Sequence, residues 1–558
     1  MNAGVCEPEE DRADIRLVEP DQKRGGVRKI ETAGKLGPFC MLPNGSLGSF
    51  YLEGKTMEQW EDLSIDQYLC MRRSHDWGLH WSDAVRVFTF PRMRGSIKIT
   101  DLDLVPFLDM EGTLHIYCFN MLNWDERFSY GERIVELWHL YSKDGGDNWG
   151  GLIRIDYGHR YTGSLNAITQ LSSGRVVMPF SYLRDGNTFV CTVIVSDDNG
   201  YTWTSSLSDV PHGDDPALHL ESGAMEPVTI EMEDGRVWMV IRTTNGRLFE
   251  AWSSDGGETW SKAEPTPFRS SNAPAALVLL GDGRMVMAWN HCKGEPFVNG
   301  VCYARQSLVA AVRERDGIWR GYREIARLDP ADHADHSVCY PWLVALPGRN
   351  ILAGLLKVHL SHWRETISFH LVSFDEDWLL ADESAADLSI FPEGFSATAC
   401  GASLGGGQIF LRGGAAGSGG ITWNFPRANH GELIVSLRLS EPFKGAAITL
   451  SETFIKPSNL QEGMFRLRVE ADGRLFVQYA NERTYEHLYK SEPLPSGEWF
   501  DLKIVWNCKR SSALVYVDGR AVGTLPKLEE GEGISYCRAV AMAGGGLEIR
   551  GIASKQYR

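Results

Sequence analysis

The chain has 558 residues, of which 43% are hydrophobic, 11% aromatic and 23% charged. This length exceeds what one hydrophobic core accommodates, so we expect a soluble protein of two or three domains. The formal net charge of −17 argues against non-specific binding to nucleic acid or to an anionic membrane. No apolar run reaches the roughly 18 residues that would predict a transmembrane helix.

The N-terminus, M-N-A-G-V-C-E-P-E-E-D-R, lacks the basic start and apolar core of a signal peptide. The 11 cysteines are odd in number and show no C-x-x-C spacing, which predicts buried free thiols rather than disulfides or a zinc site. We therefore expect a cytoplasmic protein that needs no metal or other cofactor. The sequence holds no signal for an oligomeric state.

Four segments share the pattern S-x-D-x-G-x-x-W, at residues 74–81, 142–149, 196–203 and 253–260. Two degenerate versions end at Trp319 and Trp378, so the pattern recurs about every 60 residues. In each box we expect the Asp to accept backbone N–H groups, the Gly to supply a positive φ and the Trp to pack between strands. We interpret the box as an architectural turn and not as a catalytic motif.

A second marker follows the same period: a turn glycine that precedes an apolar run. It occurs at Gly45, Gly112, Gly174, Gly235, Gly283 and Gly348. Each unit then consists of a strand, a hairpin, a strand, a connection, a strand, a box turn and a strand. Four strands in about 60 residues are typical of a propeller blade, and the chain between residues 30 and 385 has room for six blades.

A different pattern begins after residue 390. Residues 395–420 are rich in Gly, Ala and Ser and indicate a linker or loosely packed loops. Alternating apolar residues then predict strands at 432–439, 465–470, 475–479, 500–506 and 513–519. The expected chain is all-β, with a six-bladed β-propeller in residues 1–390, a Gly-rich linker in 391–425 and a β-sandwich jelly roll in 426–558.

The run G-E-W-F-D-L-K-I-V-W…A-L-V-Y-V-D-G-R-A-V-G resembles laminin-G or concanavalin-like domains. This resemblance implies two alternatives for the C-terminal domain: it binds carbohydrate, or it only shields or braces the propeller.

The boxes resemble those of the sialidases, which are propellers with BNR repeats. This resemblance implies a central site with three arginines that hold the substrate carboxylate, an Asp acid/base, and a Tyr nucleophile paired with a Glu. In M-E-P-V-T-I-E-M-E-D-G-R-V-W-M-V-I-R, the matching Glu and Arg are Glu226 and Arg242. The third arginine matches Arg305 in Y-A-R-Q-S-L, and the nucleophile matches Tyr340 in S-V-C-Y-P-W-L-V. The alternative interpretation is a surface Glu, a solvated Arg and a core Tyr.

The first blade departs from the family pattern. An arginine is expected about ten residues before Gly45, where this chain has Lys35. An ammonium offers a point charge, whereas a guanidinium binds a carboxylate with two parallel bonds, so this replacement bears on which acidic sugar is bound. Lys35 could equally lie on the surface without a role. The acid/base matches Asp62, with nearby carboxylates as rivals: Glu58, Glu61 and Asp66.

Further residues near the predicted axis are candidates for binding hydroxyls or for structural roles: Asp101 or Asp103, Asn166 and Asn272. The sequence predicts a sialidase-like exo-glycosidase that removes a terminal acidic sugar with retention, in which Tyr340 attacks and Glu226 is its base. Two alternatives are a lyase on uronate-containing glycans and a non-catalytic glycan-binding protein. The lyase would use Tyr340 or a rim histidine as its base, and the basic residues would neutralise the uronate carboxylate. The histidines that could serve a lyase or ligate a metal are His333, His336, His359 and His362, which otherwise are rim or strand residues.

Overall fold

The chain folds into two compact units. The propeller unit comprises residues 29–308 and 337–373, and the sandwich unit comprises residues 1–28, 309–336 and 374–558. None of the described helices has the length and hydropathy needed to span a membrane. The computed structural model describes residues 15–16, 28–97, 104–123, 130–160, 162, 165–184, 188–211, 222–293, 297–298, 301–302, 305–328, 336–348, 350–359, 368–391, 395–397, 401–414, 417–478, 485–487 and 492–557.

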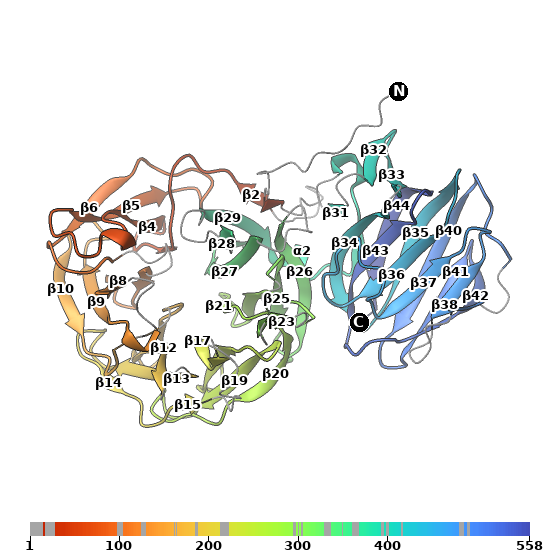
Figure 1. Cartoon of the computed structure of the whole chain (residues 1–558). Coiled ribbons are helices and arrows are strands. Elements are labelled where there is room, and N and C mark those ends of the chain that lie inside the picture. The colour runs from red at the N-terminus through yellow and green to blue at the C-terminus, as the bar shows by residue number, and fades with distance from the viewer. Residues whose placement is uncertain are drawn as a thin grey trace. The chain divides into compact units, whose positions relative to one another are not determined.

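Five separate sheets of the propeller unit lie around a common centre as the blades of a β-propeller (Figure 1). In the first four blades neighbouring strands pair antiparallel, except that β16 runs parallel to β13. The last blade is completed by β2, which comes from the start of the unit.

The blades consist, in order, of β3 (Phe39–Met41), β4 (Leu47–Gly54), β5 (Gln67–Ser74) and β6 (Val85–Phe90); β7 (Leu104–Leu108), β8 (Leu114–Met121), β9 (Val135–Ser142) and β10 (Gly150–Ile155); β11 (Thr169–Gln170), β12 (Val176–Arg184), β13 (Thr188–Ser196), β14 (Thr204–Ser205), β15 (Val210–Pro211) and β16 (Ser222–Gly223); β17 (Met225–Glu231), β18 (Val237–Arg242), β19 (Arg247–Ser253) and β20 (Glu264–Arg269); and β27 (His336–Ala345), β28 (Asn350–His359), β29 (Ser368–Asp375) and β2 (Arg28–Ile30). The unit also holds β21 (Ala276–Leu279), β22 (Met285–Trp289), β23 (Phe297–Val298), β24 (Val301–Cys302) and the 3-10 turns η1 (Met57–Gln59) and η2 (Tyr130–Glu132).

All four complete boxes form the predicted turn between the third and fourth strands of a blade. In the fourth box, Ser253 Oγ donates to Asp255 (2.8 Å) and accepts from Gly257 N (2.8 Å). The Asp of each box accepts the N–H four residues later at 2.8–2.9 Å, and the box glycines have φ between 84° and 96°. The box tryptophans pack against the blade cores. The structural interpretation of the box is confirmed.

The prediction of six blades is wrong, because the expected fifth blade is divided between the two units. Its first hairpin, β21–β22, lies in the propeller unit, whereas β25 (Ser307–Arg313) for most of its length and β26 (Trp319–Leu328) lie in the sandwich unit. There β26 pairs with β34, with Gly321 opposite Arg427.

β26 lies in the sandwich unit because its buried polar groups require hydrogen-bond partners that this unit supplies. Glu324 N donates to Asn424 Oδ1 (2.9 Å), and the Glu324 carboxylate accepts from Arg327 and from Tyr536 OH (3.0 Å). An unpaired buried carboxylate would cost several kcal/mol, on the order of 3–5. These partners lie on strands of the sandwich unit and on β26 itself, so this segment is bound to that unit.

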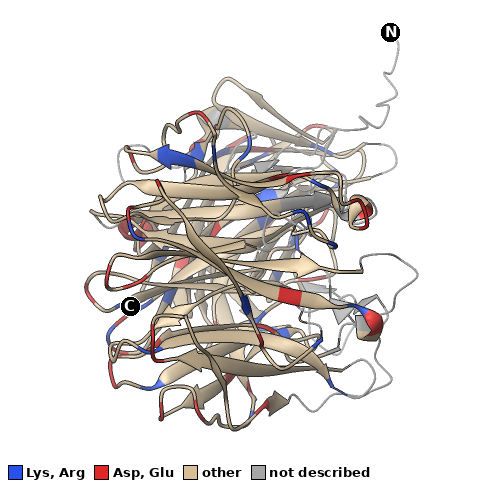
Figure 2. Cartoon of the chain, turned by 90° about the vertical axis from the view of Figure 1, so that its left-hand side faces the viewer, with Lys and Arg blue, Asp and Glu red and all other residues tan. Residues whose placement is uncertain are grey.

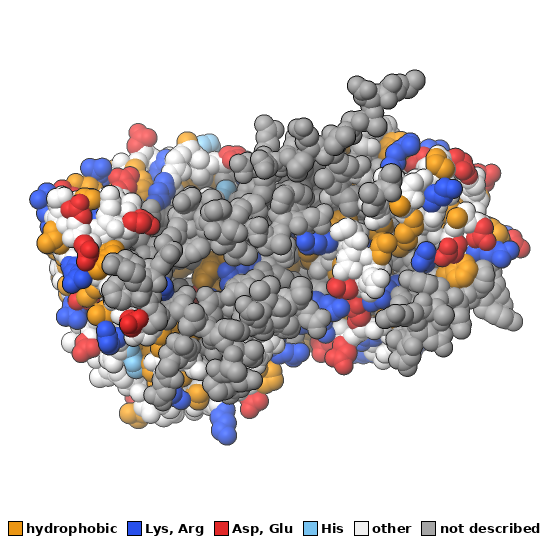
Figure 3. Space-filling model, in the orientation of Figure 1, with side chains coloured by type: hydrophobic (Ala, Val, Ile, Leu, Met, Phe, Trp, Pro, Cys, Tyr) orange, Lys and Arg blue, Asp and Glu red, His pale blue; other side chains and the backbone are white. Residues whose placement is uncertain are grey.

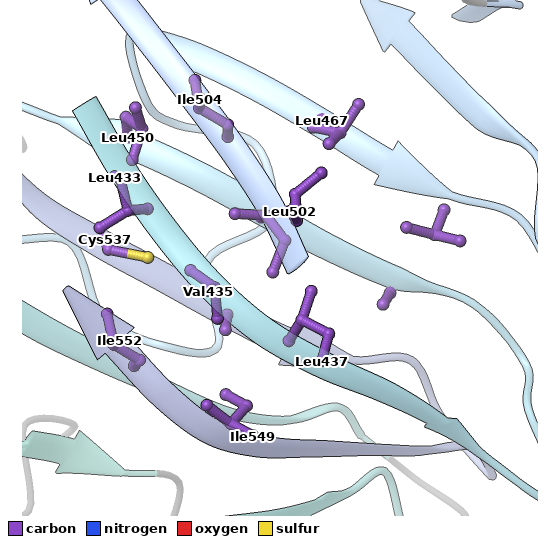
Figure 4. Packing of buried hydrophobic residues seen from close by; sticks show 14 of the residues in the cluster. Leu433, Val435, Leu437, Leu450, Leu467, Leu502, Ile504, Cys537, Ile549 and Ile552 are labelled. Carbon is purple, nitrogen blue, oxygen red and sulfur yellow. The ribbon is translucent and has the colours of Figure 1, made fainter. Parts of the chain in front are cut away.

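The sandwich unit consists of two antiparallel sheets that share one hydrophobic core. Along β35 every second side chain is buried, and Leu433, Val435 and Leu437 lie in one core with Leu450 and Cys537 of the other sheet (Figure 4). The five strands predicted after residue 430 are confirmed as β35, β37, β38, β40 and β41.

The first sheet contains β31 (Phe395–Ala397), β34 (Gly419–Ala428), β36 (Ala446–Ser451), β37 (Phe465–Val469), β38 (Leu475–Gln478), β39 (Tyr485–His487) and β43 (Ile534–Ala541), and the second contains β30 (Glu383–Ala385), β32 (Ala402–Gly405), β33 (Gln408–Arg412), β35 (His430–Ser440), β40 (Trp499–Asn507), β41 (Ser512–Val517), β42 (Arg520–Pro526) and β44 (Gly546–Gln556). Short elements of the unit are β1 (Ile15–Arg16), α2 (Glu376–Leu379) and the 3-10 turn η4 (Leu388–Ile390).

The stretch 391–425, expected to be a linker, instead carries β31, β32, β33 and most of β34. Its glycines serve close backbone approaches: a Cβ on Gly419 would lie 2.2 Å from the carbonyl oxygen of Arg412. The Gly-rich composition therefore marks tight packing between strands rather than a flexible connection.

In Figure 2, basic and acidic positions are interspersed along the described ribbon. The described cysteines are buried free thiols, as predicted: Cys40, Cys70, Cys118, Cys191, Cys292, Cys339, Cys508 and Cys537.

One buried chain of polar groups connects two strands of the second blade. Asp109 accepts from His115 Nε2 (3.1 Å), and His115 Nδ1 contacts His139 Nε2 (2.8 Å). Since His115 donates through Nε2, its Nδ1 accepts and His139 donates through Nε2. The His139 ring stacks on Tyr117 at 4.5 Å, and burial lowers the pKa of His139 to about 3.

We predict that Ser253→Ala destabilises the protein by about 1–3 kcal/mol, because the buried N–H of Gly257 loses its acceptor. Urea unfolding measures the change. The matched control is Ser254→Ala in the same box, whose exposed side chain should change the stability by less than about 0.5 kcal/mol. Equal losses in the two variants would contradict the role given to the box serine.

We also predict a pH dependence of stability that originates at His139. The folded protein holds this ring neutral, so its contribution is complete above the ordinary pKa of 6.5 and is lost as the pH falls toward 3. The free energy of unfolding should fall by up to about 1.4 kcal/mol per pH unit in this window. His139→Gln, which keeps a donor near the Nε2 position, should show a shallower slope, and an unchanged slope would refute the assignment.

Candidate functional site

Glu226 lies at the start of β17, the inner strand of its blade. The pairing of β17 with β18 shifts between Met225 and Val228, so Glu226 lies in a β-bulge. Its φ is 41°, in the left-handed region that side chains rarely adopt, and Pro227 follows it. The N–H of Glu226 donates to Ser181 Oγ on β12 (3.3 Å), which connects the bulge to the neighbouring blade.

Tyr340 occupies the same kind of position on β27. Its φ is 52°, and Pro341 follows it. The residue before a proline normally adopts extended backbone, and a left-handed conformation costs about 1–3 kcal/mol. Two non-glycine residues in this conformation at matching places point to a shared requirement on where their side chains lie. The Glu-Pro and Tyr-Pro dipeptides are a signal of this geometry in the sequence.

The side chains of Glu226, Arg242 and Tyr340 form a closed triangle of hydrogen bonds. Tyr340 OH donates to Glu226 Oε1 (2.9 Å). Arg242 Nη1 donates to Tyr340 OH (3.0 Å) and to Glu226 Oε2. Glu226 and Arg242 are buried, with 7% and 5% of their surface exposed, whereas Tyr340 is partly exposed. The phenol therefore stands between a buried ion pair and the surface.

The environment of Tyr340 acts on its pKa in two directions. Burial raises the pKa of Tyr340 well above its ordinary value of 10, and the Glu226 carboxylate raises it further. Arg242 and Arg305 lower it, because a cation stabilises the phenolate. The resting phenol is neutral and holds its proton in the hydrogen bond to Glu226, which is the acceptor nearest to it.

Asn272 connects the two arginines of the site. Its side-chain oxygen accepts from Arg242 Nε (2.6 Å), and its backbone carbonyl accepts from Arg305 Nη2. Arg305 also lies 5.8 Å from the centre of the Tyr340 ring, and its carbonyl accepts from Val338 N (2.8 Å). In the hollow at the middle of the propeller unit, basic side chains are visible (Figure 3). Two guanidinium groups and one carboxylate leave this site with excess positive charge.

Residues 100–353 match the family described as BNR repeat-like domain. Over this range, which is less than half of the chain, the protein is similar to proteins with BNR repeats. A comparison with curated proteins gives no match.

Among solved structures, the chain is similar to a protein of unknown function from Dyadobacter fermentans, with 17% identity and a TM-score of 0.44 over 65% of this chain and 99% of that one. It is also similar to Trypanosoma rangeli sialidase, with 12% identity and a TM-score of 0.42 over 98% of this chain and 97% of that one. The same sialidase in complex with sialic acid gives 12% identity and a TM-score of 0.41, over 98% and 96% of the two chains. Similarities this weak carry no inference about activity.

Four residues suggested by the sialidase resemblance meet in the propeller unit: Glu226, Arg242, Arg305 and Tyr340. Asn272, which the sequence suggested as a hydroxyl ligand, instead binds the two arginines and is fully buried. Its oxygens accept from these guanidiniums, so its observed contacts are those of a positioning residue.

Lys35 is half-buried before β3, and two contacts of its side chain are with residues of the first blade. Its Nζ donates to the carbonyl of Leu52 (3.4 Å) and lies 5.4 Å from the centre of the Tyr51 ring. These contacts place it beside β4. Its part in holding a carboxylate stays a prediction.

Asp62 is exposed in the connection between η1 and β5. Its Oδ1 accepts from the N–H (2.8 Å) and the hydroxyl (2.6 Å) of Ser64. These hydrogen bonds lower the pKa of Asp62, whereas a general acid requires a raised one. The geometry therefore gives this assignment no support. Of the rivals, Asp66 pairs with Arg92 (2.7 Å) and Glu61 with Arg94 (3.6 Å).

Asn166 lies just before β11, and its Nδ2 is buried without a hydrogen-bond partner among the described residues. A donor in this state is suited to a hydroxyl or a water. Asp101, Asp103, His333 and His362 lie outside the described residues, as do the side chains of His336 and His359. Within the described part of the chain, no three His, Cys, Asp or Glu side chains gather as a metal site would need.

We predict that Asn272→Leu destabilises the protein by about 1–3 kcal/mol, because Arg242 Nε loses a buried acceptor. Asn272→Asp is the matched control, since it keeps the acceptor oxygen and places its charge between two guanidiniums. Unfolding in urea should show a clearly smaller loss for the Asp variant. If the Asp and Leu variants lose the same free energy of unfolding, the hydrogen bond to Arg242 is not the source of the stability that Asn272 provides.

Proposed function

We propose that the chain is a retaining exo-glycosidase that removes a terminal sugar carrying a carboxylate at its anomeric carbon. The observation that carries this proposal is the hydrogen bond from Tyr340 OH to Glu226 Oε1 (2.9 Å), supported by Arg242 at 3.0 Å from the same hydroxyl. A phenol, its base and a stabilising cation are in contact before any substrate binds.

The type of nucleophile follows from the charge of the substrate. An anionic Asp or Glu would be repelled by a carboxylate next to the reacting carbon, whereas a phenol approaches as a neutral group. The Tyr340 oxygen attacks the anomeric carbon while its proton passes to Glu226 Oε1. The bond to the leaving oxygen breaks, and that oxygen takes up a proton from a carboxylic acid or from solvent. Water then attacks the anomeric carbon and gives one proton back to that acid or to solvent. The bond to the Tyr340 oxygen breaks, the phenol regains its proton from Glu226, and the sugar leaves with its configuration retained.

The arginines have two roles in this scheme. Arg242 touches the reacting oxygen, so it stabilises the negative charge that develops on Tyr340 as the proton leaves. Arg305, which Asn272 connects to Arg242, adds the second positive charge that a substrate carboxylate needs. In a buried site such charges act more strongly than in water.

The test is hydrolysis of a panel of aryl glycosides of sialic acid, its deaminated relative and glucuronic acid. We expect one acidic glycoside to be cleaved. Tyr340→Phe should lower kcat/KM by at least about 100-fold and Glu226→Gln by roughly 10²–10⁴-fold. Tyr201→Phe, an exposed phenol in the third box, is the control and should keep its activity.

Circular dichroism and thermal melting establish whether each variant is folded. Turnover that survives Tyr340→Phe in a folded protein would refute the proposed nucleophile. An unsaturated product that absorbs in the near ultraviolet would point to the lyase instead, and tight glycan binding without turnover to the glycan-binding protein.

The panel also tests Asp62, because a good aryl leaving group needs little protonation whereas a sugar leaving group needs much. If Asp62 is the acid, Asp62→Ala should slow the cleavage of an acidic disaccharide by at least about 100-fold and leave the aryl glycoside nearly unchanged. From its contact with Ser64 we expect little effect on either substrate.

A further inference from the structure

The second strand of the third blade passes the reaction centre and continues beyond it. Ser181 on β12 accepts from the N–H of Glu226 (3.3 Å) and is fully buried. The strand ends three residues later at Arg184, which at about 3.3 Å per residue lies roughly 10 Å beyond Ser181 along the strand. Tyr182 and Arg184 are partly exposed. The end of β12 thus lies three residues beyond the contact with Glu226, on a partly exposed stretch of the strand.

Four side chains from three segments meet at this end of β12, and we name them the rim cluster: His159, Tyr182, Arg184 and Asp209. The His159 ring stacks on the Tyr182 ring, with centres 3.7 Å apart and planes at 17°. Tyr182 OH donates to Asp209 Oδ2 (2.6 Å), and Arg184 Nη2 donates to the same oxygen (3.0 Å). The cluster is therefore held in one arrangement by contacts between its own members.

The rim cluster keeps polar atoms available for a ligand. Arg184 also interacts with the hydroxyl of Tyr182, and among the described residues Asp209 Oδ1 has no hydrogen-bond partner. The two charged side chains are 35% and 41% exposed. An ion pair this exposed contributes only about 0–1 kcal/mol to stability. Stability alone thus gives little reason for this arrangement.

The charge of the rim cluster differs from that of the reaction centre. Arg184 and Asp209 cancel each other, and burial lowers the pKa of His159, so its ring is neutral near pH 7. Burial and Asp209 raise the pKa of Tyr182, which keeps its hydroxyl protonated. Donors, acceptors and aromatic rings without net charge suit a neutral sugar, which presents hydroxyls and apolar C–H faces. The carboxylate of an acidic sugar would bind more favourably to the positive charges of Arg242 and Arg305.

We propose that the rim cluster is the subsite for the neutral sugar on the leaving-group side of the scissile bond. This inference rests on the proposed function, since it assigns the second residue of the same substrate. The acidic sugar occupies the site of Tyr340, and the next sugar reaches the end of β12, where Asp209 and Arg184 bind its hydroxyls. The cluster thereby selects which glycans are cleaved.

The test compares the acidic aryl glycoside with the same acidic sugar linked to lactose. The double variant Tyr182→Phe/Asp209→Asn should lower kcat/KM for the lactose-linked substrate by about 10-fold or more, which corresponds to the loss of about one hydrogen bond. Its kcat/KM for the aryl glycoside should stay within about twofold, because that substrate has no second sugar. Tyr201→Phe, in the box turn at the other end of β13, is the control and should change neither substrate.

A second measurement does not depend on catalysis: saturation-transfer NMR of lactose alone with the whole protein. Wild type and Tyr201→Phe should both give a signal that the double variant loses. If wild type cleaves neither substrate, the proposed function fails, and the lactose signal still decides whether the rim cluster binds a neutral sugar. An equal fall for both substrates, no change for either, or a lactose signal that is absent in wild type or kept in the double variant would overturn the inference.

Discussion

The site depends on one backbone constraint: Glu226 and Tyr340, on different blades, both adopt a left-handed conformation immediately before a proline. In β17 the left-handed conformation of Glu226 coincides with a β-bulge. Without the bulge, the Glu226 side chain would follow the regular alternation of side chains between the two faces of the strand. Because Pro227 and Pro341 have no N–H, the irregular backbone leaves no unsatisfied donor at these residues. The backbone strain at both residues is balanced by the contacts that their side chains make with Arg242.

Those contacts also determine the chemistry. A buried carboxylate is costly unless it is paired, and Arg242 pairs with Glu226 while touching the hydroxyl of Tyr340. Asn272 fixes Arg242 from the other side and links it to Arg305. The residues that satisfy the buried charges are thus the same residues that a phenolate nucleophile and an anionic substrate would need. The rim cluster, which is neutral, lies further along β12.

Local patterns in the sequence predicted the local structure well. The box serine and aspartate accept hydrogen bonds from backbone N–H groups within the same eight residues, so the local sequence is sufficient to specify the turn. The hairpin glycines correctly predicted the hairpin β17–β18 and the corresponding hairpins of the other blades. The blade count was wrong because the partner of β26 is decided by Glu324 and residues about 100 to 200 positions away. The stretch 391–425 was misinterpreted because glycine marks both flexible chain and close packing.

The site was predicted only in part, for the same reason. The family-like spacing suggested Glu226, Arg242, Arg305 and Tyr340, which do meet. Spacing could not show that Asn272 accepts from two arginines or that Asp62 accepts from Ser64. The rim cluster had no signal at all, because His159, Tyr182 and Asp209 come from three segments with no shared motif. The Glu-Pro and Tyr-Pro dipeptides were the overlooked sign of equivalent geometry.

The proposed mechanism requires a covalent bond between Tyr340 and the sugar. This bond can be detected by mass spectrometry of the protein after incubation with an acidic glycosyl fluoride that carries a second fluorine beside the anomeric carbon, which slows release of the intermediate. We predict a single adduct on the peptide that contains Tyr340, absent from Tyr340→Phe. An adduct on a carboxylate such as Glu226 or Asp62, or turnover of the fluoride without any adduct, would contradict the account.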